Sequence, residues 1–234
     1  MRPSLLLLKN SAPFSALSDE ALDLTRERAI TRRLPGKTFL TTSGEAWPYL
    51  MLVGSGVIQA VKESLEGRSL LVLTLDAGDV FWGVSFFDDG LRMPVSIRAA
   101  EDSELFLWQR EAILPILREN PDALWALTQL VIRRVQIASD IVDDLAFQPV
   151  AGRLARLLLD QYPDQGPVAR NLTLDEMAAR VGSTREMVCR VLYRLADDSM
   201  IHITRTEFSL INRTGLQEIA GGARGRERER PNDD

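Results

Sequence analysis

Hydrophobic and polar positions divide the chain into stretches with different periods. Between residues 38 and 110, short apolar runs such as "YLMLVGSGVIQAV" and "SLLVLTL" alternate with Gly, Asp and Pro turn signals. A spacing of roughly 8–12 residues between turns is typical of an antiparallel β-barrel or sandwich. A helix, "SDEALDLTRERA", precedes this stretch, with Ser18 placed to cap it. The pattern predicts an N-terminal β domain over residues 1–120.

One long helix is predicted next, over residues 121–147, "PDALWALTQLVIRRVQIASDIVDDLAF". Its apolar residues recur every seven positions, as in a coiled coil, and Arg134 interrupts the seam. Because the helix would be about 40 Å long, we expect it to pair with a second copy of the chain. Packing against its own β domain is the alternative. The predicted dimer seam consists of Leu124, Leu127, Val131, Ala138, Ile141 and Leu145.

Residues 148–220 have a helical pattern that ends in a hairpin. The segments "AGRLARLLLDQY", "TLDEMAARV" and "STREMVCRVLYRLADD" predict three helices, and "MIHITRTEFSLINR" predicts a two-stranded wing. Thr173 and Glu176 have capping-box spacing, and Gly182 suits the left-handed residue of a tight turn. Two short helices joined by such a turn predict a helix-turn-helix. The alternating charges of residues 221–234 predict a disordered tail.

The third of these helices has one apolar face and one hydrogen-bonding face. At about 100° per residue, Arg185, Glu186, Cys189, Arg190 and Tyr193 share the polar side. An arginine fork matches the acceptors of a guanine edge, and a carboxylate accepts from the cytosine amino group. This face therefore predicts a major-groove reader. The alternative is a solvated surface decorated with local ion pairs.

Composition and charge limit the function without identifying it. The net charge is −5, and residues 147–234 contain 13 Lys and Arg against 13 Asp and Glu. DNA binding must therefore depend on where the charges lie, and an interaction or ligand-binding module that has lost DNA binding is the competing hypothesis. The run "LLLL" at 5–8 is too short for a signal peptide or a membrane span. A single cysteine, Cys189, excludes an intrachain disulfide and fits the cytoplasm.

Several blocks, in order, resemble the Crp/Fnr family of bacterial transcription regulators. They are "FSALSDEAL", "YLMLVGSGVIQAV", "GDVF", "RRVQIASDIVDDLAF", "GRLARLLL" and "GSTREMVCRVLYRLADDSMI". The resemblance implies an α+β chain with a cupin-like β-roll sensor domain, a dimerisation helix and a C-terminal winged helix-turn-helix domain. It also implies a homodimer on a two-fold symmetric double-stranded DNA operator, and RNA polymerase as a further partner of an activator.

The resemblance also implies roles for the helix that begins "REMVCR". Arg185, Glu186 and Arg190 take base-reading positions on half-sites resembling TGTGA, with Cys189 as the small residue between them. We expect Cys189 to pack at this position rather than to act as a redox switch. The candidates for phosphate contacts, which position the protein without reading sequence, are Thr173, Ser183, Thr184 and Arg205.

The sensor domain departs from the family pattern where a cyclic nucleotide would bind. The family places a Gly-Glu pair after "GD-x-F" and an Arg-Ser pair before the next strand. This chain has Trp82-Gly83-Val84 and Arg92-Met93-Pro94 instead. We therefore do not expect cyclic AMP to be the effector. Three readings stay open, namely plain core, a cavity for an uncharged or aromatic small molecule, and no effector. The residues concerned are Trp47, Trp82, Val84, Phe86, Phe87, Arg92, Met93 and Ser139.

The residue inventory argues against the other cofactors of this family. An iron–sulfur cluster needs several cysteines, and the chain has one. A haem sensor needs a histidine in the sensor domain, whereas the single histidine, His202, lies in the predicted wing. A metal-dependent cupin enzyme needs a histidine cluster. The sequence predicts no cofactor, no metal and no enzymatic activity.

Overall fold

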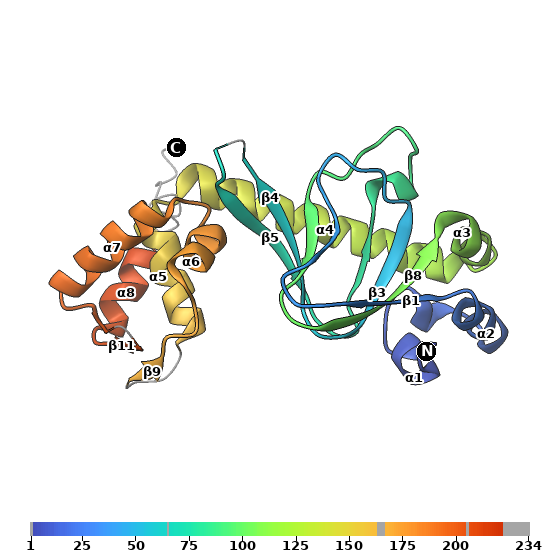
Figure 1. Cartoon of the computed structure of the whole chain (residues 1–234), viewed down its shortest axis with the longest axis horizontal. Helices are drawn as coiled ribbons and strands as arrows, with labels where there is room; N and C mark the ends of the chain where they lie inside the picture. The colour runs from blue at the N-terminus through green and yellow to red at the C-terminus, as the bar shows by residue number, and fades with distance from the viewer. Residues whose placement is uncertain (1, 65, 163–166, 205, 222–234) are drawn as a thin grey trace, which may run out of the picture. The chain divides into compact units, whose positions relative to one another are not determined.

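A computed structural model describes residues 2–64, 66–162, 167–204 and 206–221. The chain divides into two compact units (Figure 1), residues 1–63 with 71–138 and residues 64–70 with 139–234. Each unit has its own hydrophobic core. The mixed helix and strand architecture expected from the sequence is confirmed.

The first unit is built on two four-stranded sheets, which correspond to the predicted β domain. Their strand orders are β1-β8-β3-β6 and β2-β7-β4-β5, and the pairs β1–β8, β3–β8, β3–β6, β2–β7 and β4–β7 are antiparallel. The strands are β1 (Ile30–Leu34), β2 (Phe39–Thr41), β3 (Tyr49–Ser55), β4 (Ile58–Glu63), β5 (Ser69–Leu75), β6 (Val80–Trp82), β7 (Ser96–Ala99) and β8 (Ser103–Gln109).

Short helices of the first unit share a hydrophobic core with its strands. They are α1 (Leu5–Lys9), η1 (Phe14–Ala16), α2 (Asp19–Glu27), η2 (Val84–Phe86) and α3 (Arg110–Arg118). Ser18 caps α2 as predicted, because its hydroxyl accepts from Ala21 N at 3.2 Å. The buried indole of Trp108 ties β8 to α2 by donating to Thr25 O at 2.7 Å. Its ring lies 4.8 Å from that of Phe14.

The long helix α4 runs over Pro121–Phe147, which are the bounds that the sequence predicted. Its packing differs from the predicted seam, because Leu127 is buried and Leu124 and Val131 pack against the core of the first unit. These three side chains therefore contact the β domain, which is the alternative that the sequence left open for this part of the helix. The helix carries two apolar stripes, and periodicity alone did not show which one the β domain occupies.

The other apolar stripe of α4 faces outward. The exposed fractions of Trp125, Ile132, Val135 and Val142 are 64 %, 55 %, 59 % and 62 %. Arg134, which interrupted the predicted seam, is half-buried instead, and its Nη2 lies 3.5 Å from Val80 O. Burial lowers the pKa of the Arg134 guanidinium, and nearby Asp79 partly offsets this effect.

The second unit contains the predicted helices and one more. These are α5 (Val150–Gln161), α6 (Leu174–Val181), α7 (Arg185–Asp197) and, after the wing, α8 (Arg213–Gly221). The wing has three strands in the order β10-β11-β9 rather than two, namely β9 (Val168–Ala169), β10 (Ile201–Ile203) and β11 (Glu207–Leu210). Gly215 weakens the helical pattern of the α8 segment, but buried Leu216 anchors this helix to the core.

Within the part of the chain that the structure describes, no helix is both long and apolar enough to cross a membrane. The predicted tail lies almost entirely outside that part, since residues 222–234 are not described.

Candidate nucleic-acid interface

Local capping sets the geometry of the helix-turn-helix. The predicted capping box is confirmed, because Thr173 Oγ1 accepts from Glu176 N at 3.2 Å while the Glu176 carboxylate accepts from Thr173 N at 2.7 Å. Helix α6 ends at Gly182, which is left-handed at φ 60° and ψ 49°. Thr184 then caps α7 by accepting from Met187 N at 3.2 Å. Only two residues therefore separate the last hydrogen-bonded turn of α6 from the cap of α7.

Arg153 on α5 holds the end of α6 in place, a role that sequence reasoning missed. Its Nε donates to Val181 O at 2.7 Å, and its Nη1 donates to Asp144 O at 3.0 Å and to Gln148 O. Burial lowers the pKa of Arg153, and the Asp144 charge opposes this shift. The available signal was an arginine among the apolar positions of "AGRLARLLL".

The two faces of α7 separate as the sequence predicted. Its inner side chains, Val188, Val191, Leu192 and Leu195, are buried in the core of the second unit. On the outer side, Arg185, Glu186, Arg190 and Tyr193 are exposed, and Cys189 is half-buried. Helix α7 therefore presents two guanidinium groups and a carboxylate on its outer face, while its apolar inner face is fixed in the core. Their contact with bases stays a prediction.

The outward charges differ in how far they are already paired. Arg185 Nη1 lies 3.6 Å from Asp175 Oδ2, and both side chains are mostly exposed, so the pair is weak. Hydrogen bonds from its own backbone and from Thr184 lower the pKa of Glu186, with nearby Arg185 adding to the effect. Arg190 has no hydrogen bond or ion pair with any residue in the described ranges. Its guanidinium donors are free to bind an acceptor from outside the chain.

The predicted phosphate contacts have different local roles. The hydroxyls of Thr173 and Thr184 serve as helix caps, and Ser183 lies half-buried in the turn between the helices. Arg205 lies outside the described residues. His202 is exposed on β10, and the described residues include no cluster of His, Cys, Asp or Glu that could hold a metal ion.

At the first position where the sequence departs from the cyclic-nucleotide motif, the backbone of the β domain leaves no space for a side chain. A Cβ at Gly83 would lie 1.7 Å from Trp47 O, so no side chain fits there. Two hydrogen bonds fix this contact, from Gly83 N to Tyr49 O at 3.0 Å and from Trp47 N to the buried Ser85 hydroxyl at 2.9 Å. A glutamate at position 83 would therefore require the Trp47 segment to move.

The residues predicted to line an effector pocket lie in separate environments. Trp82 and Phe86 are buried in one core cluster, and Met93 with Trp47 is buried in another. Arg92 is exposed, and its Nη1 donates to the carbonyl oxygens of Asp89 and Leu91. Val84 is half-buried, whereas Phe87 and Ser139 are exposed. Trp47, Trp82 and Met93 thus fill the core, whereas Phe86 and Phe87 lie together at the wall of one pocket.

Two domain families match this chain, and together they cover most of the described elements. Residues 31–120 match the cyclic nucleotide-binding domain, and residues 152–219 match the Crp-like helix-turn-helix domain. A curated relative from Thermus thermophilus, named cyclic AMP receptor protein, is 30 % identical over 216 residues, which cover 92 % of this chain and 99 % of the relative. The cAMP-activated global transcriptional regulator of Haemophilus influenzae is 28 % identical over 79 % of this chain and 85 % of its own length.

Solved structures share the fold at lower identity. A transcriptional regulator of the Crp/Fnr family from Eubacterium rectale superposes with a TM-score of 0.75 at 18 % identity, covering 91 % of this chain and 99 % of its own. The c-di-GMP-responsive global regulator of Xanthomonas campestris gives a TM-score of 0.72 at 22 % identity, over 82 % of this chain and 99 % of its own.

Proposed function

The chain belongs to the Crp/Fnr family of DNA-binding transcription regulators, and from this premise we propose that it binds a two-fold symmetric operator as a homodimer. Its half-sites would resemble TGTGA, read by Arg185, Glu186 and Arg190. As a DNA-binding regulator it would act in the cytoplasm, and as an activator it would contact RNA polymerase.

The outward face of α7 carries this proposal. Arg190 has no partner among the described residues, and Glu186 is held in its ionised form by a lowered pKa. A guanidinium can donate twice to a guanine edge, and a carboxylate can accept from a cytosine amino group. Both side chains project from a helix whose other face is fixed in a core, so their spacing is set before DNA arrives.

The homodimer is proposed to form through the exposed stripe of α4. Trp125, Thr128, Ile132 and Val135 are exposed and alternate at spacings of three and four residues, which is the a/d pattern of a coiled coil. Each position of this stripe lies one residue after a position of the seam predicted from the sequence. In this register Arg134 is not a seam residue, and its side chain contacts the β domain instead.

For the effector, we propose that cyclic nucleotides do not bind as in the named cAMP-responsive relatives. Support comes from the Trp47 carbonyl, which occupies the space of a side chain at position 83, and from Arg92-Met93-Pro94 where the family has an Arg-Ser pair. Neither Met93 nor Pro94 can donate a side-chain hydrogen bond to a phosphate.

Selection of bound sequences from random duplex DNA tests the operator proposal. We expect an inverted repeat with half-site centres about 10 bp apart to be enriched. Arg190→Ala should lower affinity by about 1–3 kcal/mol and relax preference at one base pair per half-site. The matched control is Arg32→Ala, an exposed arginine on β1 of the first unit and thus outside the helix-turn-helix. Equal losses on all sequences for both variants would reject the base-reading assignment.

A second candidate is an interaction module whose helical domain no longer binds DNA. The observation in its favour is the neutral balance of residues 147–234, with 13 basic and 13 acidic residues. Non-specific DNA binding depends on surplus positive charge, and here no surplus exists. No enriched sequence in the selection, together with no shift of random DNA at low salt, would support this candidate.

A further inference from the structure

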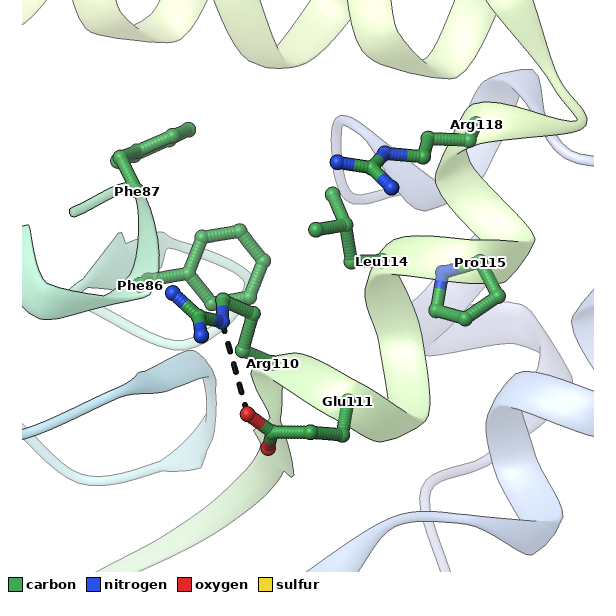
Figure 2. Close-up of a pocket in the computed structure, with 7 residues that line it drawn as sticks. All are labelled: Phe86, Phe87, Arg110, Glu111, Leu114, Pro115 and Arg118. Carbon is green, nitrogen blue, oxygen red and sulfur yellow. Dashed lines mark ion pairs between the residues drawn. The ribbon is translucent and has the colours of Figure 1, made fainter. Parts of the chain in front are cut away.

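A pocket of about 530 Å³ lies in the first unit between η2 and α3. Two of its lining residues, Phe86 and Phe87, belong to the set predicted to line an effector pocket, whereas Trp82, Gly83 and Met93 do not line it. Figure 2 shows Leu114 and Arg118 projecting from α3 towards the rings of Phe86 and Phe87. The lining residues are Phe86, Phe87, Arg110, Glu111, Leu114, Pro115 and Arg118.

The size and lining of this pocket suit a small molecule. Ligand pockets have volumes of about 300–1,000 Å³ and are mostly apolar, with a few polar groups that orient the ligand. Here the apolar part is made of two aromatic rings, a leucine and a proline. Phe87 is 52 % exposed although its ring lies 5.2 Å from Phe86, so a large aromatic surface is left uncovered.

The two arginines of the pocket differ in how their charges are compensated. Arg110 Nη1 and Nη2 bind the Asp89 carboxylate at 2.6 and 2.8 Å, and its Nε lies 3.5 Å from Glu111 Oε1. The Asp89 hydrogen bond raises the pKa of Arg110, so this cation is already paired. Arg118 lies at the C-terminal end of α3. Its side chain has no hydrogen bond or ion pair with the residues that the structure describes.

We propose that this pocket binds an amphipathic monoanion, an aromatic or branched apolar body carrying one carboxylate. Its apolar body would contact Phe86, Phe87 and Leu114, and its carboxylate would pair with Arg118. The Glu111 and Asp89 carboxylates at the other end repel a second negative charge, so they select against dianions and orient the ligand. The unmatched guanidinium beside an uncovered aromatic surface distinguishes this ligand from a neutral or cationic one.

The test uses the full-length protein and three probes that share one ring system: 2-naphthoate, 2-naphthamide and 2-naphthylmethylamine. Isothermal titration calorimetry should give the tightest binding for 2-naphthoate and the weakest for the amine. Arg118→Gln should weaken 2-naphthoate by about fivefold and abolish its advantage over the amide. The matched control is Arg32→Gln, an exposed arginine on β1 that likewise has no partner in the described ranges. This control should leave all three affinities unchanged.

The aromatic side of the pocket has its own pair of variants. Phe87→Ala should weaken 2-naphthoate by about threefold to tenfold, whereas Phe39→Ala on β2, which is 44 % exposed, should have no effect. Equal binding by wild type, Arg118→Gln and Phe87→Ala would overturn the proposal. The proposal would also be overturned if 2-naphthoate still bound to Arg118→Gln and Phe87→Ala but no longer bound to Trp125→Ala. The probe would then lie on the exposed stripe of α4. None of these measurements requires DNA, so their failure and that of the operator proposal are separate.

Discussion

The carbonyl oxygen of Trp47 lies where a side chain at Gly83 would begin, since a Cβ there would come within 1.7 Å of it. Hydrogen bonds on both sides hold this contact, so neither backbone segment can move without losing one of them. The packing of the β domain at this point therefore leaves no space for the glutamate of the family motif.

We therefore expect Gly83→Ala to destabilise the β domain by about 1–3 kcal/mol, which thermal unfolding would measure. The matched control is Gly90→Ala on the following loop, where an added Cβ meets only the side-chain oxygen of Asp88 at 3.2 Å. If Gly83→Ala had the same melting temperature as the wild type, the Trp47 segment would be shown to move at little cost to make room for the added Cβ.

Arg153 supplies a prediction for the helix-turn-helix. Arg153→Lys keeps the charge but cannot reach three carbonyl groups with a planar fork, so one or two buried acceptors lose their donor. We expect a loss of about 1–3 kcal/mol and faster amide exchange in α6, measured by hydrogen exchange. Arg180→Lys is the control, because Arg180 is exposed and makes one long contact, 3.4 Å to Gln161 Oε1. Equal exchange in both variants would contradict the anchoring role.

The cap of α7 links stability to the ionisation of Glu186. Thr184→Ala should cost about 1 kcal/mol, while Thr184→Ser should retain most of the cap. Because the folded pKa of Glu186 is lowered, the stability that it adds is present at neutral pH and is lost as pH falls below about 4.5 through the folded value. Thr184→Ala should raise the pKa of Glu186 in an NMR titration, since it removes the second of the hydrogen bonds responsible. An unchanged titration would exclude the contribution of Thr184.

The register of α4 is tested by charge insertion. Val135→Glu places a carboxylate in the exposed stripe and should dissociate the proposed dimer, as measured by analytical ultracentrifugation. Arg133→Glu places a carboxylate at an exposed b position of the same register, away from the stripe, and should leave the dimer intact. Dissociation by Arg133→Glu alone would place the seam on another face.

The sequence alone determined the features that depend on local chemistry. The bounds of α4, the capping box of Thr173 and Glu176, the left-handed Gly182 and the two faces of α7 all follow from residue spacing and backbone preference. Such features involve residues within about one helical turn, so neighbours in the sequence decide them.

Only the tertiary structure decided which apolar surface faces which partner. Helix α4 has two apolar stripes, one with Leu124 and Val131 and the other with Ile132, and their hydrophobicity in the sequence does not distinguish them. The β domain packs against the stripe of Leu124 and Val131. The anchoring of α6 by Arg153, the closure of position 83 by Trp47 and the docking of α8 through Leu216 likewise depend on contacts between segments distant in the chain. Burial and hydrogen bonding across such distances follow from the packing of whole elements, which periodicity within one element does not encode.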